Sequence, residues 1–486
     1  MEDNNNIKSK TLKGLFWIFA EQFGGRLVGF VVQILLARLM MPEDYGVIGI
    51  VLVFINVCNV FVESGFGKAL VQKKDADDLD FSSVFYINLA VVTLLYAAIY
   101  IAAPYIAAFY ELEIVCPVLR VLGLRLFIAA FQAVQRAKNT KEMQFKRYFA
   151  STVGGTLVSG IIGIVFAYYG FGVWALAAQN LSNIFINTVI LFFTVRWRPK
   201  LMFSFSRAKR LFNYGWKVLA NSLLETLYED FRNLYIGKLY NADALAYYTR
   251  GRQYPQLVVD NVNSSISSVL FPALASKQDD RSEVVGITRR AMKTSAYVLT
   301  PMLLGLAAVA EPLVLWTLTE KWLPCVPYLQ ILCINYALAP LQTANTQTLY
   351  AIGRTDLVLK LSFVKKVIGL TMVIVFARIS VLAMAWAGVA TAFINLLINA
   401  YPNKKLLGYG FWEQMRDVVP CWLISLAMML IVMSVSLLNL PTIPELIVMI
   451  LVGVVVYVVM SVIFRVESFT YILNTIKPML AKLKKK

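Results

Sequence analysis

The chain has 486 residues, of which 59% are hydrophobic and 15% charged, and its formal net charge is +18. Soluble domains are roughly 45–50% apolar, so the composition argues against an ordinary soluble protein. No histidine occurs, which excludes an imidazole base, an imidazole proton shuttle and a histidine-ligated metal. The five cysteines are scattered and odd in number, as is typical of small buried side chains and not of a disulfide framework or zinc site.

About fourteen stretches of some twenty mostly apolar residues follow one another, and each is long enough to cross a hydrocarbon core of ~30 Å as a helix. We therefore predict an all-α membrane protein with about 14 transmembrane helices. The first stretch is too long and too polar for a cleaved signal sequence, so we expect it to remain in the mature protein. The predicted spans are Leu15–Leu39, Tyr45–Glu63, Ser82–Ala103, Val115–Val134, Phe149–Tyr169, Val173–Val195, Phe212–Tyr240, Ala244–Leu274, Thr288–Ala310, Trp322–Thr348, Leu357–Arg378, Leu382–Ala400, Val418–Leu438 and Glu445–Phe464.

Lysine and arginine gather in every second loop and at both ends of the chain. Representative positions are Lys8, Lys73, Arg147, Arg207, Arg289, Lys404 and the run from Lys477 to Lys486. By the positive-inside rule both termini are cytoplasmic, which requires an even number of spans. Because the bases are dispersed among short loops, we interpret the net charge as topology and attraction to anionic membrane lipids, and we expect no nucleic-acid partner.

The chain carries a weak internal repeat. Residues 35–46 resemble residues 235–246. In both segments a helix with scattered polar residues ends in a small residue, a basic residue and Leu, and an acidic turn follows. Each copy is the first hairpin of a six-span block, which predicts parallel repeats related by an axis along the membrane normal. We expect an N-terminal lobe of helices 1–6 (1–200), a C-terminal lobe of helices 7–12 (201–405), and helices 13–14 with a basic cytoplasmic tail (406–486).

Polar side chains concentrate in three predicted spans, and in the first span they lie on one helix face. They are Gln22, Arg26 and Gln33 in the first span, Glu225, Glu229, Asp230 and Arg232 in the seventh, and Arg250, Arg252, Asp260 and Asn261 in the eighth. An arginine or aspartate at a helix centre costs ~2.5–3.5 kcal/mol on insertion scales, so these faces must line water or each other. Hydrogen bonding between packed helices is the alternative explanation, and we favour it for amides such as Asn183 and Asn395. For the charged faces we predict a hydrated central cavity between the two six-helix lobes.

The cavity is expected to be basic, because bases outnumber acids within the spans. Guanidinium groups bind phosphate and carboxylate oxygens in a bidentate manner, which favours an anionic substrate. We predict that the basic and amide residues of the three faces bind substrate. The acids Glu225, Glu229, Asp230 and Asp260 are predicted to couple an ion or to pair with the arginines.

An enzymatic function finds little support. No phosphate-binding loop is present, since Gly65–Lys68 lacks the upstream glycine and the following Ser or Thr. The acidic residues of segment 75–80 adjoin Lys73 and Lys74, and we interpret them as a solvated charge run and not as a metal–nucleotide site. The outer loops are about ten residues at most, too short to hold an active site. We expect no catalytic residue, no cofactor and no metal.

Several strings carry a family resemblance. They are Pro42–Gly46, Glu63–Gly67, Phe171–Leu176, Arg196–Pro199, Leu270–Leu274, Glu320–Pro324 and Gly353–Asp356. In order and over nearly the whole chain, they resemble the Wzx-type polysaccharide flippases, in the branch of colanic acid and teichuronic acid exporters. That branch belongs to the multidrug/oligosaccharidyl-lipid/polysaccharide exporter superfamily.

The resemblance implies two six-helix lobes, alternating access, and flipping of an undecaprenyl-diphosphate-linked oligosaccharide from the cytoplasmic to the outer leaflet of a bacterial inner membrane. Coupling of transport to H⁺ or Na⁺ is one mechanism that the resemblance allows. It also allows contacts with a polysaccharide polymerase or with glycosyltransferases. A cation-coupled multidrug antiporter of the same superfamily is the alternative, and a non-transporting scaffold for glycan assembly is a third hypothesis. The glycan, the coupling ion and the oligomeric state stay open.

Overall fold

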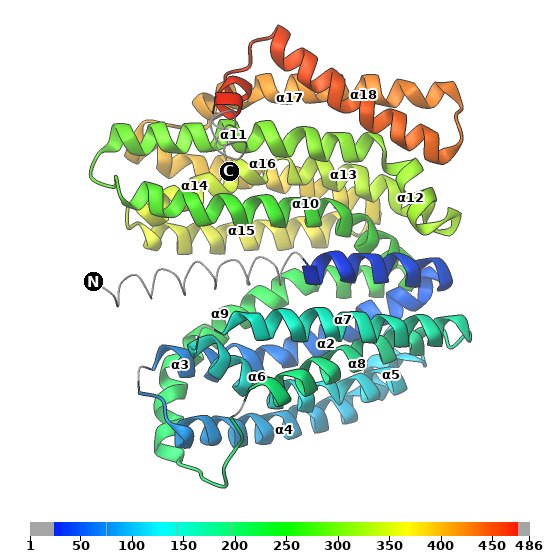
Figure 1. Ribbon diagram of the computed structural model, residues 1–486, viewed down its shortest axis with the longest axis vertical. Coiled ribbons are helices and arrows are strands. Elements are labelled where there is room, and N and C mark those ends of the chain that lie inside the picture. Colours follow the sequence, from blue (N-terminus) through cyan, green and yellow to red (C-terminus); the bar gives the residue numbers. More distant parts are fainter. Residues whose placement is uncertain (1–23, 74, 143, 196, 475–486) are drawn as a thin grey trace, which may run out of the picture. The chain divides into compact units, whose positions relative to one another are not determined.

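The computed structural model describes residues 24–73, 75–142, 144–195 and 197–474, and all of the regular secondary structure in these ranges is helical (Figure 1). A first helix covers residues 24–39. The elements that follow are α2 (Pro42–Glu63), α3 (Phe66–Gln72), α4 (Asp78–Tyr110), α5 (Val115–Gly123), α6 (Arg125–Lys141), α7 (Phe145–Tyr168), α8 (Val173–Thr194), α9 (Phe205–Leu239), α10 (Ala242–Ala275), α11 (Arg281–Ala308), α12 (Ala310–Leu318), η1 (Glu320–Cys325), α13 (Val326–Tyr336), α14 (Ala339–Ala351), α15 (Thr355–Phe376), α16 (Val381–Leu407), α17 (Phe411–Ser434), η2 (Val435–Leu438) and α18 (Thr442–Ile463).

Within the described residues, ten helical segments are long and apolar enough to cross a membrane, or up to eleven with the pair α11 and α12, which is bent by 68°. The ten are Pro42–Gln72, Asp78–Tyr110, Val115–Lys141, Lys146–Tyr168, Val173–Thr194, Ala242–Ala275, Glu320–Ala351, Val381–Leu407, Phe411–Leu438 and Thr442–Ile463. The predicted all-α membrane class is therefore confirmed. Three further predicted spans overlap the helix at 24–39, α9 and α15, of which the last two carry several charged residues. The part of the first predicted span before residue 24 lies outside the described residues. The count of fourteen stays a prediction.

The chain divides into two compact units, Met1–Ala246 and Tyr247–Lys486. Unit 1 holds the helices through α9 and the first residues of α10, and unit 2 holds the rest. α9 belongs to unit 1 because it packs along α2, α3 and α4. The predicted lobes group helices by the internal repeat instead, and that grouping stays a prediction.

The helix ends agree with the repeat. The first described helix ends at residue 39 and α2 begins at Pro42, while α9 ends at Leu239 and α10 begins at Ala242. The two hairpins therefore turn at equivalent positions.

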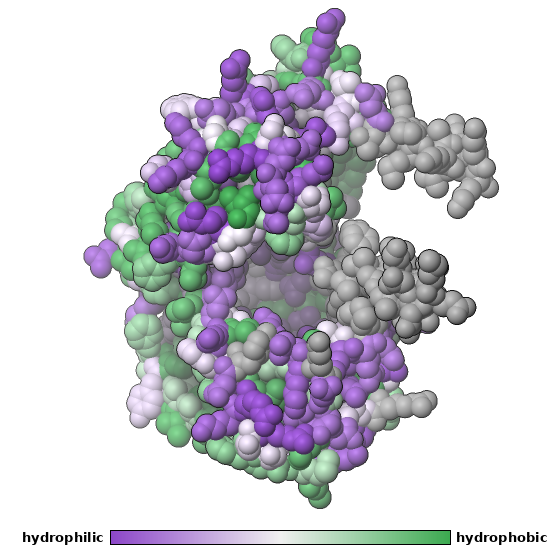
Figure 2. Space-filling model, turned by 90° about the vertical axis from the view of Figure 1, so that its left-hand side faces the viewer, coloured by the Kyte–Doolittle hydropathy of each residue, from purple (hydrophilic) through white to green (hydrophobic). Residues whose placement is uncertain are grey.

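Hydrophobic side chains cover the flanks of the helices. Figure 2 views the chain from the end at which α3 lies in Figure 1, and hydrophilic residues gather there on the viewed face of each unit. α18 illustrates the flanks, since Leu451, Val455 and Val462 are each more than half exposed. Such exposed apolar surface is unfavourable in water and is expected of helices that face lipid.

Glycines allow close helix packing inside unit 1. α2 meets the start of α10 closely, because a Cβ on Gly46 would lie 1.9 Å from the carbonyl oxygen of Ala242. The helix at 24–39 approaches α7 in the same way, because a Cβ on Gly160 would lie 2.5 Å from a methyl of Val32. Small residues at such contacts let backbones pack closely, which stabilises helices where water does not drive their association.

We predict that Gly46→Ala destabilises the protein by about 1–3 kcal/mol, because the new methyl group must push against backbone that cannot rotate away. Gly286→Ala is the matched control: it also lies inside a helix, no atom lies within 4 Å of its added Cβ, and alanine favours helix by up to ~1 kcal/mol. Thermal unfolding in detergent would measure both. A melting temperature for Gly46→Ala equal to that of the parent would contradict this packing.

Candidate functional site

The polar face of the first helix lies apart from its packing face. Gly25, Gly29 and Val32 face α7. Arg26, which is exposed, and the half-buried Gln33 follow a neighbouring stripe. The exposed apolar residues Leu27, Val31, Leu35 and Leu39 lie roughly on the opposite side from that polar stripe. The predicted site residue Gln22 lies outside the described residues.

α9 presents two polar surfaces. Asp230 points toward α2, where it accepts a hydrogen bond from Asn56 at 3.5 Å, and it also accepts one from Asn233 at 3.4 Å. Glu225 and Glu229 are exposed on another face, with Arg232 one further turn along. Tyr228 lies within electrostatic range of all three of these charged groups. The structure thus brings these groups of α9 together, whereas Asp230 serves the contact with α2.

Arg250 is buried within unit 2, with 6% of its surface exposed. Its guanidinium lies 5.0 Å from the centre of the Trp322 ring and donates a hydrogen bond of 2.7 Å to the Gln253 side-chain oxygen. Gly251 makes this burial geometrically feasible, because it brings α10 against the backbone of Cys325. A cation over an indole ring is worth up to ~2 kcal/mol when desolvated. Arg250 therefore fastens α10 to η1.

The other predicted residues of α10 are more accessible. Arg252 is half-buried, while Asp260 and Asn261 are exposed. Asn261 donates a hydrogen bond from its side-chain nitrogen to the backbone oxygen of Leu257, one turn back. The predicted residues of unit 2 thus separate into one buried anchor, Arg250, and an accessible polar stretch.

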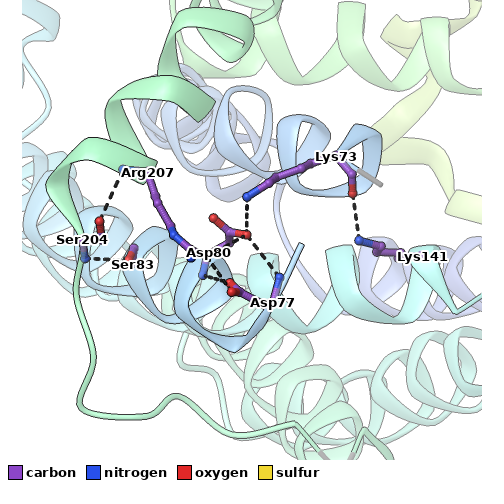
Figure 3. A network of polar contacts seen from close by, with 7 residues as sticks. All are labelled: Lys73, Asp77, Asp80, Ser83, Lys141, Ser204 and Arg207. Atoms are coloured by element: carbon purple, nitrogen blue, oxygen red, sulfur yellow. Dashed lines mark hydrogen bonds and ion pairs between the residues drawn. The ribbon is translucent and has the colours of Figure 1, made fainter. Parts of the chain in front are cut away.

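A second polar cluster joins α3, α4 and α9 in unit 1 (Figure 3). Asp80 has no exposed surface and accepts a 2.5 Å hydrogen bond from Lys73. Arg207 of α9 lies 3.7 Å from Asp80 and donates a 2.5 Å hydrogen bond to Asp77. Lys141 of α6 reaches the backbone oxygen of Lys73 at 2.8 Å. We call Lys73, Asp77, Asp80 and Arg207 the α3–α4 clamp.

The clamp corrects one interpretation from the sequence. The sequence predicts that the acidic residues of segment 75–80 form a solvated charge run. This prediction holds for Asp75, which is exposed, but it is wrong for Asp80, which is buried. Asp80 is buried because it closes a capping box with Asp77 at the start of α4 and meets two bases from other helices. Those bases lie 7 and 127 positions away in the chain, so local sequence gave no signal for their convergence.

The segment 197–204, which leads into α9, packs against the start of α4. Trp197 donates a hydrogen bond of 3.2 Å to Asp78 and packs its ring on Phe81. The backbone nitrogens of Lys200 and Ser204 donate to Ser82 and Ser83 at 3.1 and 2.9 Å. The segment that connects the two predicted repeats is thus held by both backbone and side-chain contacts.

The contact between Asp77 and Arg207 stays ionised near neutral pH. The Arg207 hydrogen bond is the main reason that the pKa of Asp77 falls from its usual 3.8 to about 2. A lowered carboxyl pKa contributes stability above the ordinary pKa, and this contribution is lost only as the pH falls through the folded value. Between pH 5 and 8 the contact is therefore insensitive to pH.

Unit 2 contains a comparable cluster that the sequence did not suggest. Asp417 of α17 is nearly buried and lies 2.6 Å from Arg289 and 3.5 Å from Lys293. Tyr409 donates a further hydrogen bond to it at 2.9 Å. Among the described residues, no group of three or more acidic, Cys or His side chains is placed to hold a metal ion.

Comparison with known proteins gives consistent matches. Residues 35–327 match the family described as "Polysaccharide biosynthesis protein". The teichuronic acid biosynthesis protein TuaB of Bacillus subtilis (strain 168) is 27% identical over 387 residues, which cover 78% of this chain and 79% of that protein. The lipopolysaccharide biosynthesis protein WzxC of Escherichia coli (strain K12) is 21% identical over 86% of this chain and 85% of its own length. The solved structure of the lipid II flippase MurJ, in an inward closed conformation, shares the fold: the TM-score is 0.75 over 93% of this chain and 98% of that one, at 15% identity.

We predict that Lys73→Ala lowers stability by about 3 kcal/mol, because it leaves a buried carboxylate without its nearest base. Asp75→Ala changes a neighbouring exposed carboxylate and is expected to have an effect within about 0.5 kcal/mol. The melting temperatures of both variants in detergent would test the difference. Equal melting temperatures would show that the Asp80 carboxylate does not depend on Lys73.

Proposed function

Since the chain belongs to the family of polysaccharide biosynthesis proteins, whose model matches more than half of its length, we propose that it is a flippase for surface polysaccharide synthesis. It moves undecaprenyl-diphosphate-linked oligosaccharide units from the cytoplasmic to the outer leaflet of a bacterial inner membrane. The relationship to polysaccharide flippases predicted from the sequence is confirmed. The observation that carries the proposal is the family match, which the fold of a lipid flippase supports. A diphosphate with attached sugars is too polar to cross hydrocarbon unaided, so it requires a shielded path.

The proposed mechanism is alternating access through a basic central cavity formed by two six-helix lobes, with fourteen spans and both termini in the cytoplasm. Its physical basis is the cost of placing a charge in hydrocarbon. The exposed Arg26 and the charged face of α9 need water, an ionic ligand or each other if these helices span the bilayer. Basic loops alternate with loops that hold few bases, which supports the orientation with both termini in the cytoplasm.

Substrate contact is proposed for Arg26, Arg252 and Asn261, with contributions from Gln22, Gln33 and Arg232. Guanidinium groups hold phosphate oxygens through paired hydrogen bonds, and an amide suits sugar hydroxyls. Arg250 is proposed as a positioning residue, because its guanidinium is already held by Trp322 and Gln253.

Ion coupling is proposed for Glu225, Glu229 and Asp260, which are exposed carboxylates on α9 and α10. Asp230 is proposed to orient α9 through Asn56 and Asn233. The same acids support the second candidate function, a cation-coupled multidrug antiporter, since paired carboxylates on one helix face would bind a cationic drug. H⁺ or Na⁺ is the proposed ion in either case.

The orientation can be tested by cysteine accessibility in intact cells. Single cysteines at the exposed Lys209 and Lys404 should resist a membrane-impermeant reagent applied from outside, whereas a cysteine at the exposed Glu320 should react. External labelling at position 209 would refute the proposed topology.

Transport can be tested with single substitutions. Arg26→Ala and Arg252→Ala should insert normally but export glycan about tenfold more slowly, which corresponds to the loss of one charge-assisted hydrogen bond. Arg26→Lys should recover only part of the rate, because lysine keeps the charge and loses the fork. Arg250→Ala should slow export and should also lower the melting temperature, because Arg250 anchors α10 to η1.

Val455→Ala, at an exposed apolar position of α18, is the matched control and should export at the parental rate. If Arg26→Ala and Arg252→Ala both export glycan at the parental rate, the basic cavity is wrong. If Glu225→Gln then abolishes efflux of a cationic dye, the antiporter becomes the better description.

A further inference from the structure

A basic corner of unit 2 lies where two candidate spans end together. α17 and α18 are packed partners joined by a short turn (Figure 1), so the start of α17 and the end of α18 lie at the same end of the pair. Arg416 lies in the second turn of α17, and Arg465 follows α18 by two residues. Arg465 has φ of 49°, a left-handed conformation that ends the helix and turns the chain. Because both helices are long enough to cross a bilayer, this corner is expected at the level of the lipid headgroups.

Two neighbouring pockets open at this corner and share Lys293, Glu467 and Ser468. The smaller, of about 300 Å³, is lined by α11 and the segment after α18, and includes Arg290. The larger, of about 570 Å³, lies along α17 and the end of α18 and includes Arg416 and Arg465. Together they offer room for a phosphate headgroup and the first part of an acyl chain.

The charges of the corner do not balance. Asp417 is compensated by Arg289 and Lys293, and Lys293 also pairs with Glu467 at 2.6 Å. No ion pair joins Arg290, Arg416 or Arg465 to a carboxylate among the described residues, and the contact of Arg290 is with the ring of Tyr471, 5.7 Å from its centre. Three guanidinium groups thus remain available to an anionic ligand.

The wall of the larger pocket is apolar. Pro420, Leu423, Ile424, Met460 and Phe464 line it. Leu423 and Phe464 are 60% and 64% exposed on the flank of the unit. A soluble anion would gain nothing from such a wall, whereas a molecule with a phosphate and a hydrocarbon tail would contact both the bases and the wall.

We propose that this corner, defined by Arg290, Arg416, Arg465 and the apolar wall, is a binding site for an anionic phospholipid. The guanidinium groups of Arg416 and Arg465 contact its phosphate, and the acyl chain follows Leu423 and Phe464. The bound lipid holds α17 and α18 against α11. This site is separate from the residues proposed to bind the transported glycan, and it does not depend on what the protein transports.

The test uses the full-length protein in detergent, titrated with phosphatidylglycerol or phosphatidylcholine, with bound lipid counted by native mass spectrometry. The parent protein should bind phosphatidylglycerol more tightly than phosphatidylcholine. Arg416→Ala/Arg465→Ala should weaken phosphatidylglycerol binding about twenty-fivefold, at about fivefold for each base near a phosphate, with phosphatidylcholine binding unchanged.

Two further variants keep the test decisive. Lys404→Ala/Lys405→Ala removes two exposed bases from α16 and should bind phosphatidylglycerol as the parent does. Arg416→Lys/Arg465→Lys keeps both charges and should retain most of the affinity, even if the alanine variant proves unstable. Equal affinity for the two lipids, an equal loss in the α16 control, or complete displacement of phosphatidylglycerol by excess inorganic phosphate would each overturn the proposal, the last by identifying a soluble anion as the ligand.

Discussion

The cost of moving a charge out of water is the constraint on which the rest of this structure depends. An ionised side chain in a helix that crosses hydrocarbon must reach water, pair with an opposite charge or interact with a polarisable ring, because the uncompensated alternative is too expensive. The chain uses each solution at a different place. Arg26 stays exposed on the side of its helix away from the apolar stripe, Asp80 meets two bases, and Arg250 lies over Trp322.

These solutions have different consequences for stability and movement. A buried ion pair such as Asp80 with Lys73 adds little net stability compared with an apolar pair, but removing one partner is costly. The main effect of such a pair is therefore to specify which helices pack together, and its effect on the stability of their contact is smaller. The α3–α4 clamp and the Asp417 cluster both have this character, and each joins the start of one helix to a helix distant in sequence. Both clusters lie near helix ends, where water can solvate the outer groups of each cluster.

Close backbone packing is the second means of holding helices together. Where the surroundings are as apolar as the side chains, helix association gains nothing from expelling water, and shape complementarity must supply the energy. Gly46 against Ala242 and Gly160 against Val32 provide that complementarity in unit 1, and Gly251 against Cys325 provides it in unit 2. The last of these contacts also brings Arg250 to Trp322, so packing and charge compensation are coupled at α10. The string from Glu320 to Pro324, which carries part of the family resemblance, thus includes the ring that compensates a buried arginine.

The sequence by itself determined the helical class, the positions of nearly all helices and the family, because apolar length and local strings are properties of contiguous residues. It also identified the residues whose charge is difficult to place in a membrane helix, including Arg26, Glu225 and Arg250. Only the tertiary structure decided how each charge is accommodated: that Asp80 is buried while Asp75 is exposed, that Arg250 is an anchor, and that α9 packs on α2. The partners in these contacts come from segments far apart in the chain, and a periodic pattern specifies which face of a helix is polar but not which other helix meets it.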